Sequence, residues 1–294
     1  MNYINVEIEI KEDDKNKKIR IINSFEQVKK QNNWDDEDDD YKYENEKDLK
    51  QYCQIKVRNR KIPFSYFYVF HQKGKFSIQY IFSKNITKID YLFSECSSLT
   101  NIDFSHFNSQ NVNNMNCLFS ECSSLKNINL TNFNTQNVIY MGAMFDGCRS
   151  LTNLNLSNFN TRNAISMNGM FYGCSSLINL DLSNFNTQNV NDMSCMFENC
   201  SSLININLSS FNIGKIRNMY RMFYKCSCLT YLDLSNFNTQ NVYNINSMFY
   251  GCTSLTYLDI SNFNIQNITD MRDIFKECPS LFNNQTIKTI LNNI

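Results

Sequence analysis

The chain has 294 residues and equal numbers of acidic and basic side chains, which gives zero formal net charge and an isoelectric point near 6.7. No overall electrostatic field favours nucleic acid, so no nucleic-acid partner is predicted. Its apolar stretches are far shorter than the ~20 residues of a membrane-spanning helix, so no membrane insertion is predicted either.

Residues 1–75 form a charged first segment, which holds more than half of the charged side chains of the chain. Alternating runs at 4–10 and 19–22 predict a hairpin around a charged turn, and 52–62 and 64–70 predict further strands. We expect this segment to be a β-rich cap that covers one end of the structure that follows.

From residue 76 onward, one motif recurs every 26 residues without insertion or deletion. Phenylalanines from Phe93 to Phe275 and leucines from Leu99 to Leu281 keep this interval, and so do eight cysteines. The cysteines are Cys96, Cys122, Cys148, Cys174, Cys200, Cys226, Cys252 and Cys278. A fixed period of this length is typical of a solenoid, whose units bury their apolar faces against one another.

Each unit is predicted to begin with a short strand. Leu177, Leu180 and Leu182 have the spacing that turns the last two side chains inward. A less regular unit begins near Phe76, on the same phase, and its strand would be the first of eight parallel strands.

The second half of each unit is predicted to be a short helix. In one unit four apolar residues recur at steps of 3, 4 and 3, namely Val190, Met193, Phe197 and Cys200. The residue before the cysteine is Gly147, Gly173 or Gly251 in three units and Asn199 in a fourth. Gly and Asn tolerate the left-handed conformation that ends many helices.

Strand, turn and short helix in succession predict an α/β fold of the leucine-rich-repeat plan. We expect a right-handed solenoid over residues 76–281, with a parallel sheet on the concave side and helices on the convex side. Residues 282–294 are amphipathic and predict a C-terminal capping helix.

Stretches such as 193–203 (Met-Ser-Cys-Met-Phe-Glu-Asn-Cys-Ser-Ser-Leu) and 232–242 (Leu-Asp-Leu-Ser-Asn-Phe-Asn-Thr-Gln-Asn-Val) carry a family resemblance. They resemble the BspA-type leucine-rich-repeat family, known for its bacterial surface protein 26-residue repeat, and the resemblance covers residues 76–281. It implies a non-enzymatic, adhesin-like surface role in binding host or matrix proteins, and it brings no catalytic residues.

An asparagine directly follows the phenylalanine that comes after each predicted strand, and it recurs in every unit. We interpret this column as a hydrogen-bonded ladder along the solenoid axis. The column is Asn108, Asn134, Asn160, Asn186, Asn212, Asn238 and Asn264.

The eight evenly spaced cysteines are interpreted as buried, reduced thiols that act as small hydrophobic groups. Cys117 and Cys195 share a phase but lie three units apart, too far for a disulfide. Cys226 and Cys228 form an isolated pair without a second pair, so no zinc or other metal site is predicted.

Catalysis is not predicted, because only His71 and His106 are available and no cluster of a nucleophile with a base breaks the repeat. No glycine-rich phosphate loop occurs, and the acidic run 35–40 lacks the alternation of a calcium loop. No cofactor is therefore expected.

Two departures from the repeat are candidate binding sites. Outward strand positions that are Asn or Asp in most units become Tyr231 with Asp233 and Tyr257 with Asp259, and exposed Tyr is common in binding hot spots. A second candidate is a basic helix face for phosphate or an acidic partner, formed by Lys215, Arg217, Arg221 and Lys225. The alternative for the tyrosine site is random sequence change at exposed positions. The alternative for the basic site is an ordinary solvated helix face.

The sequence leaves two functions open. One is a surface or adhesin-like module that binds a protein on the concave sheet face, as the resemblance implies. The other is an intracellular interaction scaffold, favoured by the thiol-rich core and by a first segment without the apolar stretch of a secretory signal. The oligomeric state and the ligand are not specified by the sequence.

Overall fold

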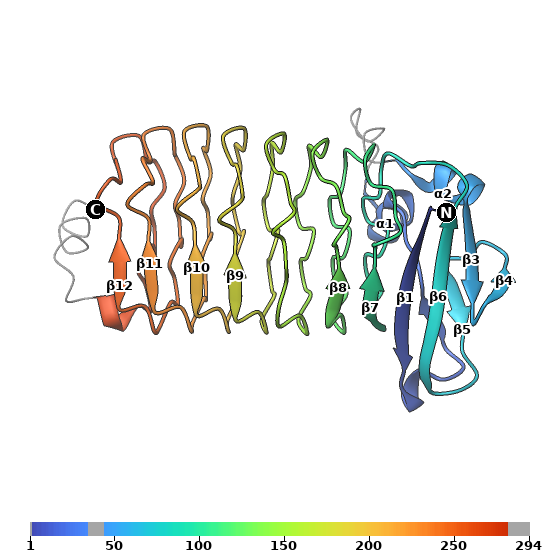
Figure 1. The fold of residues 1–294 in the computed structure, drawn as a ribbon. Helices are drawn as coiled ribbons and strands as arrows, with labels where there is room; N and C mark the ends of the chain where they lie inside the picture. Colours follow the sequence, from blue (N-terminus) through green and yellow to red (C-terminus); the bar gives the residue numbers. More distant parts are fainter. Residues whose placement is uncertain (1, 35–43, 282–294) are drawn as a thin grey trace.

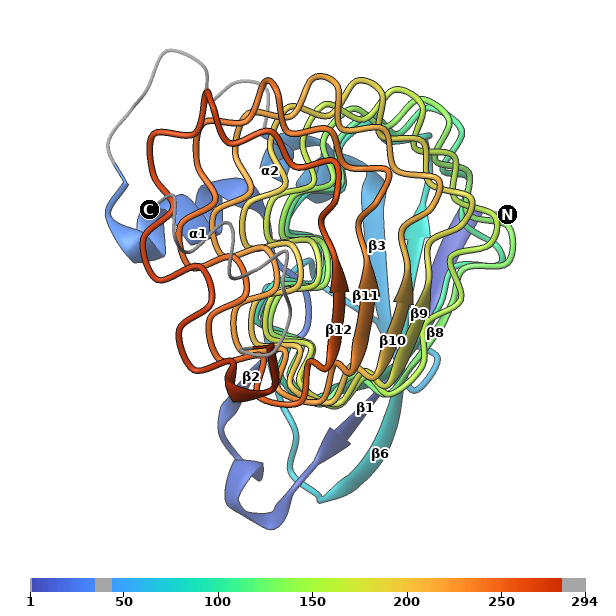
Figure 2. The ribbon, with the colours of Figure 1, turned by 90° about the vertical axis from the view of Figure 1, so that its left-hand side faces the viewer.

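The computed structural model describes residues 2–34 and 44–281 (Figure 1). An N-terminal sheet with two helices is followed by a row of coils that lie side by side in chain order (Figure 1). Seen along this row, successive coils superimpose and strands β8 to β12 lie along one side (Figure 2). The predicted C-terminal capping helix lies outside the described residues.

The N-terminal part consists of six strands, two α-helices and one 3-10 turn. These are β1 (Asn2–Ile10), η1 (Glu12–Asp14), β2 (Lys18–Arg20), α1 (Phe25–Asn32), α2 (Glu46–Tyr52), β3 (Cys53–Val57), β4 (Arg60–Ile62), β5 (Phe67–Val69) and β6 (Gly74–Phe82), the last of which leads into the coils. No helix in the described part of the chain is long and apolar enough to cross a membrane.

Strand β1 joins the N-terminal part to the coils. It lies in a six-stranded sheet of order β4-β3-β6-β1-β7-β8, antiparallel to β6 on one side and to β7 (Leu99–Asp103) on the other. Its alternate residues Ile4, Val6, Ile8 and Ile10 are buried. The strand therefore covers the first edge of the coil sheet with backbone hydrogen bonds and an apolar face, as a cap must.

Two strand predictions in this region are wrong. The runs 4–10 and 19–22 do not form a hairpin, because β1 pairs with β6 and β7 while β2 pairs antiparallel with β5. The strand at Phe76 is not the first parallel strand either. It belongs to β6, which lies beyond β1, so only the second half of that unit joins the coil ladders.

The coils are connected by two parallel ladders with a step of 26 residues. One is interrupted and consists of three separate pairs, β7 with β8 (Asn127–Asn129), β9 (Asn179–Asp181) with β10 (Asn205–Asn207), and β11 (Tyr231–Asp233) with β12 (Tyr257–Asp259). The other is a chain of single bridges from Lys88 through Asn114 to Asp270. A final 3-10 turn, η3 (Pro279–Leu281), ends the described coils.

The helices predicted opposite the sheet are absent from residues 83–281, where η3 is the only helical element described. Each is replaced by two successive turns. The N–H of Met196 donates to the carbonyl of Met193 (3.3 Å), and that of Cys200 to Phe197 (3.1 Å). The third residue of each turn, Cys195 or Asn199, has a positive φ of 56° or 61°. That is the backbone pattern of a type II turn.

Alternate N–H groups of these turns bind the next coil. Met193 donates to the carbonyl of Asn218 (3.1 Å) and Cys195 to that of Tyr220 (2.8 Å). A helix would use these donors within its own segment, so the inter-coil bonds explain why helix formation is avoided. The residue before each column cysteine is left-handed, as expected for the Gly and Asn positions and seen at Gly173 with φ of 65°, but it closes a turn and does not end a helix.

The core consists of straight columns of side chains. Phe145, Phe171 and Phe197 stack with centroids 5.7 Å apart and ring planes 3° apart. The column cysteines are buried and free, as predicted, and all twelve cysteines of the chain are free. Each thiol of the cysteine column from Cys122 onward also donates to a phenylalanine carbonyl of the previous coil, as Cys174 Sγ does to Phe145 at 3.1 Å.

The predicted asparagine ladder uses other residues. The Oδ1 of Asn186 accepts the N–H of Gln188 (3.0 Å) in its own coil and so closes a local turn. Bonds between coils come from its neighbours instead. Asn189 Nδ2 donates to the Arg162 carbonyl (2.9 Å), and Thr187 Oγ1 donates to the Asn212 carbonyl (2.8 Å).

Candidate binding surfaces

Two stacked tyrosines stand out on the exposed face of the sheet. Tyr231 and Tyr257 occupy the same register on β11 and β12, with ring centroids 4.5 Å apart and ring planes 6° apart. Their exposed fractions are 49% and 44%. The structure thus places this predicted pair together and toward solvent. Leu232, which follows Tyr231 on β11, points inward.

Asp233 and Asp259 share the next register on the same two strands. The Oδ1 of each accepts the N–H of the serine two residues on, Ser235 or Ser261, at 2.9 Å. The Ser235 side chain and then the Ser235 N–H lower the pKa of Asp233, because hydrogen bonds from both favour the ionised carboxylate. Both aspartates hold turns as well as contributing negative charge beside the tyrosines.

Two exposed isoleucines that directly precede strands β9 and β10 were missed by the sequence analysis. Ile178 and Ile204 are 40% and 41% exposed, and the N–H of Ile204 donates to the carbonyl of Ile178 (2.9 Å). Other coils have a polar residue at this position, such as Thr152 or Lys126, so the change to Ile was a readable signal. We call Tyr231 and Tyr257 the sheet-face patch.

The patch borders a hollow of about 330 Å³. Tyr231 and Asp233 line one part of it, and Ile206, Asn207 and Leu208 of the preceding coil line another. A partner side chain could enter here beside the exposed ring of Tyr231.

The four basic residues do not share one face, because the helix that was expected to align them is absent. Arg221 and Lys225 lie in the turns, with positive φ of 52° and 57°. Arg221 is 3.4 Å from the Glu198 carboxylate and 4.6 Å from the ring centroid of Tyr224. Tyr224 in turn stacks on Tyr250 at 4.8 Å, an aromatic pair that the sequence analysis also missed.

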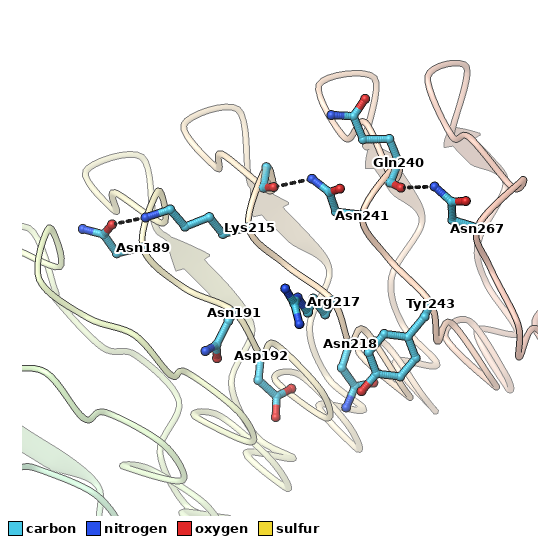
Figure 3. Close-up of a pocket in the computed structure, with 11 residues that line it drawn as sticks. Asn189, Asn191, Asp192, Lys215, Arg217, Asn218, Gln240, Asn241, Tyr243 and Asn267 are labelled. Carbon is cyan, nitrogen blue, oxygen red and sulfur yellow. Dashed lines mark hydrogen bonds between the residues drawn. The ribbon is translucent and has the colours of Figure 1, made fainter.

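Lys215 and Arg217 line a different feature, an open groove of about 970 Å³ across successive coils (Figure 3). Lys215 Nζ donates to Asn189 Oδ1 at 2.8 Å. Tyr243 and several amide side chains complete the lining. The predicted basic face is therefore two separate sites, one paired with Glu198 and tyrosines and one in a polar groove.

The repeated coils also agree with a comparison against known families. A family model described as "Mycoplasma protein of unknown function, DUF285" matches four overlapping stretches, 40–150, 64–179, 126–232 and 204–291. The chain belongs to this family. Four overlapping matches to one model are the pattern of a repeat protein. No curated protein and no solved structure matches the chain.

In this DUF285 chain the two histidines lie at the cap and at its junction with the coils. His71 Nδ1 is 2.9 Å from Asn16 Oδ1, and His106 stacks on Tyr3 with centroids 4.6 Å apart. Within residues 2–34 and 44–281, no three or more His, Cys, Asp or Glu side chains gather as a metal site.

Proposed function

We propose that this DUF285 chain is a non-enzymatic repeat protein that binds a protein ligand on the exposed sheet face. The observation that carries the proposal is the sheet-face patch. Two exposed stacked tyrosines lie on a face whose other outward positions are mostly Asn and Asp. Exposed apolar and aromatic side chains gain free energy when a partner covers them, and Tyr is enriched among binding hot spots.

The finer form of the proposal is a right-handed leucine-rich-repeat solenoid of the BspA type, with an adhesin-like role at a cell surface and a host or matrix protein as ligand. The resemblance of the 26-residue units supports it. An intracellular scaffold is the alternative, and the twelve free cysteines support that, because reduced thiols are typical of intracellular proteins. Protease treatment of intact source cells distinguishes the two, since only a surface protein is cleaved.

The binding surface is tested with random peptides displayed on phage and selected against the wild-type chain. The double variant Tyr231→Ala/Tyr257→Ala should keep its fold, because neither ring is in the core. Each truncation should weaken the binding of the selected peptides by about 1–2 kcal/mol, roughly 5- to 30-fold in the dissociation constant, as measured by biolayer interferometry.

The matched control is Asn153→Ala/Asn179→Ala, which changes the same outward column in other coils. It should leave binding within about twofold. Equal losses in the two double variants, or peptides that bind both as tightly as the wild type, would place protein binding away from the patch.

A further inference from the structure

The groove beside Lys215 lies where one coil differs from the preceding coil at five successive positions. Residues 212–217 read Asn-Ile-Gly-Lys-Ile-Arg, whereas the preceding coil reads Asn-Thr-Gln-Asn-Val-Asn at 186–191. Gly214 replaces a residue that is Gln or Arg in the other coils, which removes a long side chain from the groove wall. Lys215 replaces an Asn, and Arg217 brings a second positive charge.

The functional groups in this groove are only partly used by the fold. Asn241 Nδ2 donates to the Gly214 carbonyl (2.7 Å) and Asn267 Nδ2 to the Gln240 carbonyl (2.6 Å), which ties the coils together (Figure 3). In contrast, the Arg217 guanidinium and the Tyr243 hydroxyl make no hydrogen bond or ion pair with any residue that the structure describes. Both side chains are exposed, Tyr243 by 46%.

The free groups stand in one row along the coils. The N–H of Arg217 donates to the Asn191 carbonyl (3.0 Å), and that of Tyr243 to the Arg217 carbonyl (2.9 Å), so the three residues occupy equivalent places in adjacent coils. Figure 3 shows Arg217 between Asn191 and Tyr243, with Lys215 in the row above. Asp192 is the one acidic residue of the lining, and its Oδ1 is held by the N–H of Ser194 (2.8 Å).

We propose that this groove binds an acidic glycan, a sugar chain whose units carry carboxylates. A guanidinium matches a carboxylate with two parallel hydrogen bonds, and Lys215 adds a second charge. Amides such as Asn191 and Asn218 both donate and accept, which suits the hydroxyl groups of a sugar. The exposed ring of Tyr243 offers an apolar platform with a polar tip for the flat face of a pyranose.

Other ligands fit this groove less well. Nucleic acid is held mainly by several phosphate contacts, and two cations beside Asp192 supply too few. A peptide gains most of its affinity from apolar anchors in pockets, and the lining has one aromatic ring among amides and charges. The proposal concerns a site that shares no lining residue with the hollow beside the sheet-face patch.

The test titrates the full chain with a hexasaccharide of alternating glucuronate and N-acetylglucosamine, followed by calorimetry. Neutral chitohexaose, hexaglutamate and inorganic phosphate serve as comparison ligands. The uronate hexasaccharide should bind at least tenfold tighter than each of the three, and more weakly as salt is raised. Absence of binding, or equal or tighter binding of any comparison ligand, overturns the proposal.

Variants that copy neighbouring coils locate the site without foreign residues. Arg217→Asn copies Asn191, and Gly214→Gln copies Gln188 and refills the groove. Each should weaken the hexasaccharide at least tenfold while circular dichroism and the melting temperature stay unchanged. Arg162→Gln removes the same kind of charge two coils before Gly214, at a residue outside the groove lining, and should change binding less than twofold. If Arg162→Gln matches Arg217→Asn, or if neither groove variant that folds weakens binding, the glycan does not bind in this groove.

Discussion

Each column cysteine both fills space and donates a hydrogen bond. Cys174 is fully buried, and its thiol donates to the same Phe145 carbonyl that accepts the N–H of Cys148 (3.1 Å). Alanine would lose the sulfur and the S–H donor, and valine has no donor either. Cysteine suits this site because its side chain is small and largely apolar and still carries one weak hydrogen-bond donor.

Cys174→Ala should therefore lower the free energy of unfolding by about 1 kcal/mol, and Cys174→Asp by several times more, because it buries a charge. Urea unfolding measures both.

In the native wild type, a thiol reagent should modify the exposed Cys228 first. Burial raises the pKa of Cys200 to about 12, so at pH 8 it has almost no reactive thiolate. Fast labelling of the whole cysteine column before unfolding would contradict this packing.

Asp146 should make stability depend on pH. Burial, with the Glu121 carboxylate nearby, raises the pKa of Asp146 to about 6, and its Oδ1 has no hydrogen-bond partner among the described residues. The unfolded chain releases this proton near pH 4. The folded state therefore loses stability as pH rises from about 4 to about 6, and the loss is complete above that range.

Asp146→Asn should raise the melting temperature by a few degrees at pH 7.5 and change it little at pH 4. The amide keeps an acceptor for the Ser120 hydroxyl, which lies 3.3 Å from Asp146 Oδ2. A difference between variant and wild type that is the same at both pH values would show that ionisation of Asp146 is not the cause.

At the level of the coil, threonine side chains connect one turn to the next. Thr187 Oγ1 donates to the Asn212 carbonyl and accepts the Asn212 N–H, both at 2.8 Å, and Thr187 is fully buried. Thr187→Val keeps the shape but leaves two backbone groups unpaired, which should cost about 1–3 kcal/mol in urea unfolding. Thr230→Val, at an exposed position, should cost less than about 0.5 kcal/mol. Similar costs at the two positions would mean that the threonine bridges do not stabilise the stack.

The sequence predicted the repeat length, the inward residues and the left-handed positions, because these depend on side-chain identity at fixed spacing. It failed at the turns because the 3, 4, 3 spacing of Val190 to Cys200 suits a helix and a pair of four-residue turns equally well. Gly169 and Gly173, four residues apart and both with positive φ, were the local signal for two turns.

The candidate sites were predicted in the same uneven way. Tyr231 and Tyr257 were found because strand alternation and a 26-residue step place them in one column. Arg217 and Arg221 were grouped by a helical spacing that the chain does not adopt, so their separation could be seen only in the structure. The groove depends on Gly214, which leaves space because it has no side chain. No sequence motif signals such an absence.

In the whole molecule, the N-terminal cap protects one end of an otherwise open stack. Tyr80 of β6 packs on Phe93 with centroids 5.4 Å apart, and Phe82 packs on Phe107 at the same distance. Strand β1 satisfies the edge of β7. Without these contacts the first coil would expose aromatic rings and a free strand edge together, which favours edge-to-edge association.

Deletion of residues 1–82 should therefore give a protein that self-associates, as measured by sedimentation velocity, and melts at a lower temperature than the full chain. A substitution inside the cap gives the control. Replacing the exposed η1 residues Glu12 and Asp13 by Ser leaves β1 and β6 in place and should not alter sedimentation. A monomeric deletion variant with an unchanged melting temperature would show that the coils need no cap at this end.

The parallel ladders carry one more consequence, for how such a chain can change in length. Along the single-bridge ladder from Asn114 to Asn244, each coil donates to one neighbour and accepts from the other at equivalent positions. A tandem duplication of 26 residues would therefore insert a coil whose two faces already fit, and lengthen the sheet by about 4.8 Å. An insertion within a coil whose length is not a multiple of 26 residues would put the phenylalanine, cysteine and leucine columns out of phase. Gene-level slippage between copies can thus produce folded variants in whole-coil steps, each with a longer face for binding and the same cap.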